Sequence, residues 1–401
     1  MKLSSGLGLA GVGLCAIGLA LTTGCSSSSS SNSTGDGGGG GTGSDKCGDP
    51  GVQCTTQPAA PTSGSPTSKS HNYAVRTLYL GDAKRPATPG GTPMPDTSAW
   101  KDYGYNLDGL ITTKDSTDVC TLAAGAQKTA QIDGTGGIDN SFGENILPIV
   151  ITTAGSDAAS RINQSISDGS FTVMTFITGF DDSAGSTANA TGLSGVLLAG
   201  GNYTTATDGG MPTWDTNTHW PVLPNLITGC DGTNGCPAGT DPVANAQIKF
   251  PMAYQAGGTF VNGSPGDLDL TLSIGGQSLD LKVHSAIITF KPLMPGAVTD
   301  GTIAGTIVTS ELIDSLKSVA GHISTSLCSG SAFDSIAQQI TQASDILISG
   351  STVSNASGQA CNGISIGLGF EATEIAAPTA ADVIKPQPPA PDPCADAGAG
   401  M

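Results

Sequence analysis

The clearest indication of the fold is the stretch Asp267-Leu-Asp-Leu-Thr-Leu-Ser-Ile274, followed by Gly275-Gly276-Gln277 and by Ser278-Leu-Asp-Leu-Lys-Val-His284. Apolar and polar side chains alternate on both arms, which is the pattern of a strand with one buried face. The two glycines between the arms tolerate the positive φ angles that tight hairpin turns require. This stretch therefore predicts an antiparallel β-hairpin.

Segments on both sides of the hairpin predict further strands, because they are rich in apolar and β-branched residues. These segments are residues 74–80, 171–178, 195–199, 247–250, 258–261, 286–290, 302–308 and 363–375. Apolar residues spaced three and four apart predict helices at about 141–168 and 311–348. Runs of strands with a helical pair inserted late predict an α+β fold. We expect mainly an antiparallel β-sandwich-like body with helices at one end.

The charge of the chain excludes one class of partner. There are 33 acidic and 15 basic residues among 401, so the formal net charge is −18. Such a surface repels phosphate backbones, and no basic stripe offsets it, so we expect no nucleic-acid partner. Nearly all acidic residues are Asp, which favours turns and caps. The few Glu residues are Glu144, Glu311, Glu371 and Glu374.

The amino-terminal segment has the features of an export signal. Met1-Lys2 is positively charged, residues 7–21 are apolar, and small residues precede Cys25. The ending Leu21-Thr22-Thr23-Gly24-Cys25 resembles the lipobox of bacterial lipoproteins, although Leu21 lies four positions before the cysteine, where three is usual. The resemblance covers only this segment and implies that Cys25 is lipidated. The alternative is an ordinary secretory signal that leaves Cys25 as a thiol or disulfide partner.

The composition divides the chain into four parts. Residues 1–24 are the expected signal peptide, and residues 25–70, rich in Ser, Gly, Pro and Thr, are a predicted disordered, flexible tether. Residues 71–375 form the predicted body, and residues 376–401 a Pro/Ala-rich tail. In lipoprotein sorting, Ser26 after the cysteine implies the outer membrane. The expected product is exported and lipid-anchored there, either periplasmic or surface-exposed.

The cysteines predict disulfides. Of the ten, Cys15 lies in the signal and Cys25 would carry lipid, which leaves an even number in an exported chain. Their spacing is too wide for a zinc knuckle. The pairs that we predict from spacing are Cys47–Cys54, Cys230–Cys236, Cys328–Cys361 and Cys120–Cys394.

A second candidate site is a loop with a dense set of oxygen ligands. Asp133, Asp139, Asn140 and Glu144 lie between glycine turns, and calcium binds six to eight such oxygens. The loop lacks the spacing of an EF-hand. A turn followed by a capped helix is therefore the favoured interpretation, with calcium as the alternative. We expect no other cofactor.

Two further motifs are candidates for a ligand-binding and a catalytic site. Trp214, Asp215, Asn217 and Trp220 could form a sugar-binding loop through stacking and hydrogen bonds, although Trp also packs under loops. Residues 363–367 match the Gly-x-Ser-x-Gly nucleophile elbow, but they continue a strand and no histidine follows.

The four histidines are dispersed, so the sequence supports no catalytic zinc site. They are His71, His219, His284 and His322. Together the observations favour a surface-anchored lipoprotein with a non-enzymatic binding or structural role. Its expected partners are a membrane, through the lipid anchor, and a carbohydrate or another component of the cell envelope. The alternative is an extracytoplasmic hydrolase that acts on polysaccharide or peptide.

Overall fold

A computed structural model describes most of the chain from residue 43 onward. The described residues are 43–154, 158–207, 210–230, 234–264, 266–274, 277–323, 325–328 and 330–385. Within these ranges the side chains of 153, 154, 158, 271–280, 322, 323 and 326 are not described. The predicted signal peptide, Cys25, the tether up to residue 42, Cys394 and the end of the tail lie outside them.

Eight antiparallel strands form a closed barrel. Going round it, they are β11 (Gln277–Met294), β12 (Ala297–Val308), β15 (Gly363–Ile375), β2 (Ser70–Tyr79), β6 (Thr172–Thr178), β7 (Ala190–Gly200), β8 (Ile248–Ala256) and β9 (Thr259–Val261). β9 closes the barrel by pairing with β11, where Phe260 is opposite Phe290.

The hairpin predicted from residues 267–284 is confirmed. β10 (Gly266–Ile274) pairs with the first half of β11, from Leu268 opposite Val283 to Ile274 opposite Gln277. Leu268 and Val283 are buried, as the alternation requires. The second half of β11 turns into the barrel wall, so this 18-residue strand serves both the hairpin and the barrel.

The mainly antiparallel β architecture is confirmed, but the predicted sandwich is wrong. Alternation identifies a strand's buried face and does not reveal whether that face meets a second sheet or curls onto itself. Here β-bulges shift the register within β11, β12 and β7. Bulges bend the bulged strand and increase its twist, which lets one sheet close on itself.

Aromatic side chains fill the barrel interior. Phe290 is 1% exposed, and its ring centroid is 4.7 Å from that of Phe260, 5.6 Å from Phe180, 5.7 Å from Tyr73 and 6.0 Å from Phe370. Rings at 4.5–7 Å with tilted planes are the favoured arrangement. The interior is therefore a packed core.

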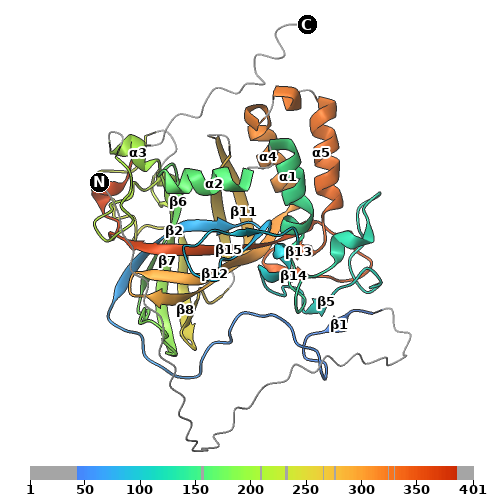
Figure 1. The fold of residues 1–401 in the computed structure, drawn as a ribbon, viewed down its shortest axis with the longest axis horizontal. Helices are drawn as coiled ribbons and strands as arrows, with labels where there is room; N and C mark the ends of the chain where they lie inside the picture. The colour runs from blue at the N-terminus through green and yellow to red at the C-terminus, as the bar shows by residue number, and fades with distance from the viewer. Residues whose placement is uncertain are drawn as a thin grey trace, which may run out of the picture. The chain divides into compact units, whose positions relative to one another are not determined.

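The two predicted helical regions are confirmed, with different boundaries. The earlier region forms a π-helical turn (Phe142–Ile146), α1 (Leu147–Ala154) and α2 (Ala158–Ser167). The later region forms α4 (Thr309–Ile323) and α5 (Gly330–Gln342). α4 packs on β11 and α2 on β2, and the helices gather on one side of the barrel (Figure 1).

The second helical region ends earlier than predicted. Residues 347–349 form β13 and pair with β14 (Thr352–Ser354). The apolar residues at 347–349 happen to fall at the helical spacing of the preceding segment, but α5 ends at Gln342. The remaining small elements are β1 (Asp45–Lys46), β3 (Ala83–Lys84), β4 (Met94–Pro95), β5 (Leu110–Ile111), α3 (Tyr203–Ala206) and 3-10 turns at 99–102, 128–131, 224–226, 325–328 and 380–382.

The last part of the predicted tether is attached to the body. β1 pairs with β5, Thr55 N donates to Gly136 O at 2.8 Å, and Thr67 N donates to Gly179 O at 2.9 Å. The predicted boundary between tether and body at residue 70 is therefore too late. Backbone hydrogen bonds order a segment whose composition predicts a flexible coil.

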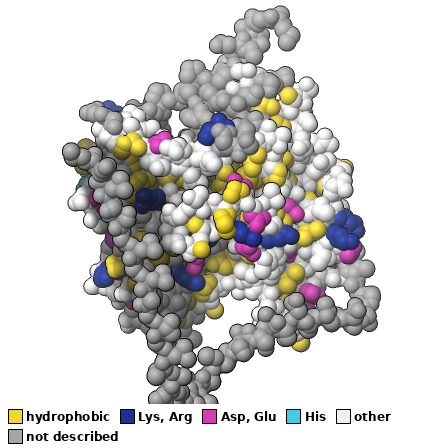
Figure 2. Space-filling view, viewed as in Figure 1, with side chains coloured by type: hydrophobic (Ala, Val, Ile, Leu, Met, Phe, Trp, Pro, Cys, Tyr) yellow, Lys and Arg dark blue, Asp and Glu magenta, His cyan; other side chains and the backbone are white. Residues whose placement is uncertain are grey.

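The surface carries few charges. On the face seen in Figure 2, most exposed atoms belong to uncharged side chains and backbone, and acidic side chains lie beside basic ones near its centre. Among the described residues, no helix has the length and apolar character needed to cross a membrane.

Candidate functional site

Three disulfides are present between described cysteines. Cys47–Cys54 and Cys230–Cys236 are paired as predicted. The predicted partners of Cys120 and Cys361 are wrong, because these two residues bond to each other across 241 positions. Cys328 is also disulfide-bonded, and its partner lies outside the described residues.

The Cys120–Cys361 pairing follows from a contact between two loops. Thr121 N donates to Gln359 O at 2.7 Å, and Cys361 N donates to Thr121 O at 3.0 Å. This bridge places the two cysteines side by side. Spacing along the chain contains no information about it.

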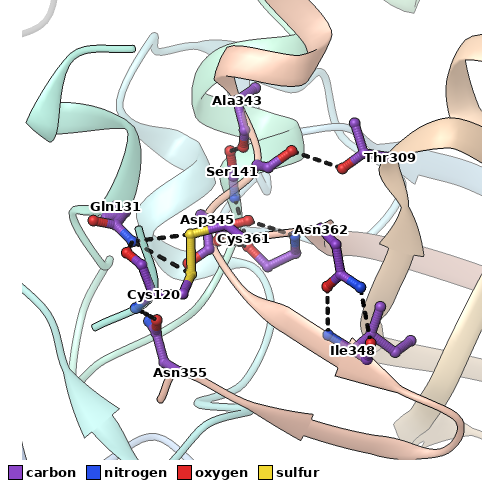
Figure 3. The surroundings of a disulfide bond; sticks show 12 residues. Cys120, Gln131, Ser141, Thr309, Ala343, Asp345, Ile348, Asn355, Cys361 and Asn362 are labelled. Atoms are coloured by element: carbon purple, nitrogen blue, oxygen red, sulfur yellow. Dashed lines mark hydrogen bonds between the residues drawn. A yellow bond between two sulfur atoms is a disulfide. The ribbon is translucent and has the colours of Figure 1, made fainter. Parts of the chain in front are cut away.

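The disulfide lies among buried polar groups. Gln131 Nε2 donates to Cys120 O at 3.0 Å and lies 3.4 Å from Cys361 Sγ, and Cys120 N donates to Asn355 Oδ1 at 2.7 Å (Figure 3). Asp345 O is 3.5 Å from Cys120 Sγ. The hydrogen bonds join the loops around residues 120, 131, 355 and 361 into one unit.

Beside the disulfide lies a set of four carboxylates that we call the carboxylate group: Asp108, Asp133, Asp139 and Asp345. Backbone N–H groups position each of them. Leu107 N donates to Asp139 at 2.6 Å, Leu110 N to Asp108 at 2.8 Å, and Thr112 N to Asp133 at 2.5 Å. Ser365 donates to Asp345 from its N at 2.9 Å and from its Oγ at 2.5 Å.

Burial dominates the electrostatics of the group. It raises the pKa of Asp345 to about 7, although hydrogen bonds from Ser365 offset part of the effect. Burial also raises the pKa of Asp139 well above its ordinary value, and the charges of Asp108 and Asp133 raise it further. Burial is also the largest cause of the raised pKa values of Asp108 and Asp133. The charge of Asp118 adds to the effect on Asp108, and the charges of Asp108 and Asp345 add to the effect on Asp133. The four carboxyls therefore oppose one another's ionisation.

The carboxylate group lacks a compensating cation among the described residues. The ion pairs between described side chains are formed by other acids. Thr112 Oγ1 is buried there without a hydrogen-bond partner. Uncompensated buried charge is costly, so these carboxyls need either protons or a bound cation. Oxygen ligands from glycine-rich loops are what calcium prefers.

The structure brings together half of the residues predicted for calcium. Asp133 and Asp139 belong to the carboxylate group, and Glu144 is near enough for its charge to act on Asp133. The pKa of Glu144 is itself raised to about 7 by burial. Asn140 is committed elsewhere, because its side chain bonds to Trp100, Tyr103 and Gly367. Calcium binding stays a prediction.

Asp108 and Asp345 were missed by the sequence analysis. Asp108 lies in a loop followed by Gly109, and Asp345 lies just after α5. Neither belongs to a motif with recognisable ligand spacing. Hydrogen bonds between the segments 105–112 and 133–139 bring Asp108 to Asp133 and Asp139. Asp345 is held by Ser365 and lies beside Cys120.

A cleft of about 490 Å³ borders the carboxylate group. Leu107 connects the two, because it lines the cleft and its N donates to Asp139. The lining also includes Tyr254, whose hydroxyl donates to Pro58 O at 2.6 Å. The full lining is Thr56, Gln57, Pro58, Ala59, Ala60, Asn106, Leu107, Tyr254, Ser285, Ile287, Ser351 and Val353.

The predicted sugar-binding loop is only partly accessible. Trp220 is 1% exposed and donates from Nε1 to Gly201 O at 2.8 Å, so it is a packing residue. Trp214 is half-buried, with its ring centroid 5.1 Å from that of Trp220, and has a φ of 56°. Asp215 and Asn217 are exposed, and Asn217 N donates to Asp215 Oδ1 at 2.8 Å. Sugar binding stays a prediction for these three residues.

The Gly-x-Ser-x-Gly match is structural. Ser365 is fully buried in β15 and accepts a hydrogen bond from Ser141 N at 2.8 Å. Gly367 allows close packing, because a side chain there would collide with Tyr103 O. Ser365 therefore lacks the exposed position of a nucleophile elbow.

Comparison with protein-family models, curated proteins and solved structures found no significant match to this chain.

The carboxylate group predicts an unusual pH dependence. Above about pH 4 the unfolded chain has released carboxyl protons that the folded chain still holds, so the free energy of unfolding falls as pH rises toward the raised pKa values. One such group contributes up to about 1.4 kcal/mol per pH unit. Urea unfolding in chelator at about pH 5 and pH 8 measures the slope. Asp133→Asn should flatten it, and a wild-type slope equal to that of Asp133→Asn would contradict the account.

If calcium binds the carboxylate group in place of protons, it should stabilise the folded chain at a pH where the carboxyls lose those protons. We expect about 1 mM calcium to raise the melting temperature at pH 8 relative to chelator, because the ion binds only the folded state. Asp133→Asn should respond less. An equal melting temperature in calcium and in chelator would end the calcium prediction.

Proposed function

We propose that this chain is an exported bacterial lipoprotein, anchored to the outer membrane through a lipidated Cys25, with a non-enzymatic binding or structural role. The observation that carries the proposal is the Cys120–Cys361 disulfide, of which Cys120 is buried and Cys361 half-buried. Disulfides form and persist in exported proteins and are rare in the cytosol. An exported chain needs an export signal, and the lipobox-like segment that ends at Cys25 is the part of the sequence that resembles one.

The packed barrel interior supports a role on the outside of the barrel. Aromatic rings around Phe290 leave the interior filled. A partner would therefore bind at a surface feature, and the cleft beside the carboxylate group is the best candidate. Gln57, Tyr254 and Ser285 offer it an aromatic ring and hydrogen-bonding groups. Such a lining suits a carbohydrate or a peptide of the cell envelope.

Fatty-acid labelling in a bacterial host tests the anchor. The wild-type chain is expected to take up radioactive palmitate, and Cys25→Ala is expected to lose the label, because the lipid is attached to that thiol. Cys15→Ala is the matched control and should keep the label, since Cys15 lies in the part that is removed. Equal labelling of the wild type and Cys25→Ala, or no label in either, would contradict the anchor.

A further inference from the structure

A second group of ligand atoms lies at the barrel wall, apart from the carboxylate group. His71 is in β2, Glu374 is in β15, and Asp182 follows β6. These three strands are adjacent in the sheet. One ligand atom from each residue lies within 4.8 Å of the others, in the one such group of three found among the described residues.

The two carboxylates converge on the same nitrogen. His71 Nδ1 is 2.8 Å from Glu374 Oε1 and 3.8 Å from Asp182 Oδ2. Ligand atoms about 2.1 Å from a tetrahedral ion lie roughly 3.4 Å from one another. The two observed distances lie on either side of this value, so small side-chain rotations would complete the arrangement.

The group is buried and carries excess negative charge. The side chains of His71, Asp182 and Glu374 are 6%, 5% and 19% exposed. Lys69 Nζ holds Asp182 Oδ1 at 3.0 Å, whereas Asp182 Oδ2 receives no hydrogen bond from any described residue and points toward His71. Besides the imidazole, the group contains two carboxylates and one lysine, whose formal charges sum to one negative charge. A divalent cation would neutralise it.

Backbone contacts hold the three ligands in place. Gly179 N donates to Lys69 O at 2.8 Å, which joins the start of β2 to the end of β6. The Gln255 side chain accepts from Asp181 N at 3.0 Å and donates to Asp181 O at 2.9 Å, which positions the loop of Asp182. Glu374 N donates to Gly296 O at 2.8 Å. Metal sites bind best when their ligands are positioned in advance.

Two other histidines show what is particular to His71. His284 contacts two carboxylates through opposite nitrogens, with Asp267 at 3.1 Å from Nδ1 and Glu311 at 2.8 Å from Nε2. His219 contacts a single carboxylate, that of Asp382, at 3.3 Å. Neither arrangement places three ligand atoms around one point.

We propose that His71, Asp182 and Glu374 bind a divalent transition-metal ion of the zinc class. One imidazole nitrogen and two carboxylate oxygens are established zinc ligands, and three protein ligands leave a fourth position open. Lys69 acts on the ion through Asp182, as an outer partner that orients the carboxylate. Its side chain is 58% exposed, so solvent reaches the edge of the site.

Zinc titration of the purified full chain tests the site. Calorimetry is run near pH 7.5 on metal-free protein, with millimolar calcium present to occupy sites made only of oxygen ligands. The wild type is expected to bind one zinc ion with micromolar or tighter affinity. Glu374→Gln, an isosteric change at the most exposed ligand, should weaken binding at least tenfold, and Asp182→Asn should do the same. His284→Gln and His219→Gln should bind as the wild type does.

Cobalt supplies a second readout, which reports the coordination of the bound ion directly. Co²⁺ in place of zinc should give visible absorption bands in the wild type and in His284→Gln, and these bands should be lost in Glu374→Gln. A thermal melt of Glu374→Gln confirms that it is folded. No zinc binding by the wild type, unchanged binding in both Glu374→Gln and Asp182→Asn, or loss of binding in His284→Gln would overturn the proposal.

Discussion

Replacing Cys120 and Cys361 together with alanine is expected to lower the melting temperature by about 5–10 °C. The disulfide joins residues 241 positions apart. Removing a crosslink that closes so long a loop raises the entropy of the unfolded chain. The expected loss of stability is about 5 kcal/mol in the simplest chain model and about 2–4 kcal/mol by the typical effect of a disulfide. The same change frees the loops that position Asp345 and Asn355. Thermal unfolding without reductant is the measurement.

A matched control comes from the same chain. Cys230 and Cys236 close a loop of only 6 positions, for which the chain model gives about 2 kcal/mol. The double alanine variant at this pair should therefore unfold closer to the wild type. Equal melting temperatures for the wild type and the Cys120/Cys361 variant would mean that the long crosslink does not hold the body together.

Phe290→Ala is expected to destabilise the body by about 3–5 kcal/mol, because it removes the ring at the centre of the packed interior. Phe290 is 1% exposed and contacts four other aromatic rings. It also lies in the register that closes the barrel, opposite Phe260. Chemical denaturation gives the change in the free energy of unfolding.

Two further variants make the Phe290 test specific. Phe290→Leu keeps most of the side-chain volume, so it should lower the free energy of unfolding clearly less than Phe290→Ala does. Met252, which is 64% exposed on β8, should tolerate alanine with a change below about 0.5 kcal/mol. A loss of less than about 1 kcal/mol in the free energy of unfolding for Phe290→Ala would contradict a filled barrel interior. The interior would then become a candidate binding cavity.

The elements of the fold could be predicted from the sequence, but their closure could not. The hairpin at 267–284 was readable because alternation of side chains fixes which residues face the core. The closing strand β9 has only three residues, and its pairing with β11 depends on bulges that leave no periodic signal. Composition likewise misassigned residues 43–70, since their order comes from backbone hydrogen bonds and not from apolar side chains.

The candidate sites were harder to predict, because their residues are close only in the fold. Local density of oxygen ligands in the sequence indicates Asp133 and Asp139. Asp108 joins them through hydrogen bonds between the segments 105–112 and 133–139, and Asp345 lies beside Cys120. His71 was rejected as a zinc ligand because no histidine lies near it in the sequence. Its partners are acids on the adjacent strand β15 and in the loop after β6, and adjacency of strands was not part of the sequence pattern.

Peptide mapping of the protein recovered from its native cell envelope tests most directly whether the body folds in an oxidising compartment. The protein is alkylated, digested without reductant and analysed by mass spectrometry. We predict that the peptide containing Cys120 is linked to the peptide containing Cys361, and that reduction separates them. Recovery of Cys120 and Cys361 as separately alkylated thiols would contradict both the fold around this crosslink and the proposed export.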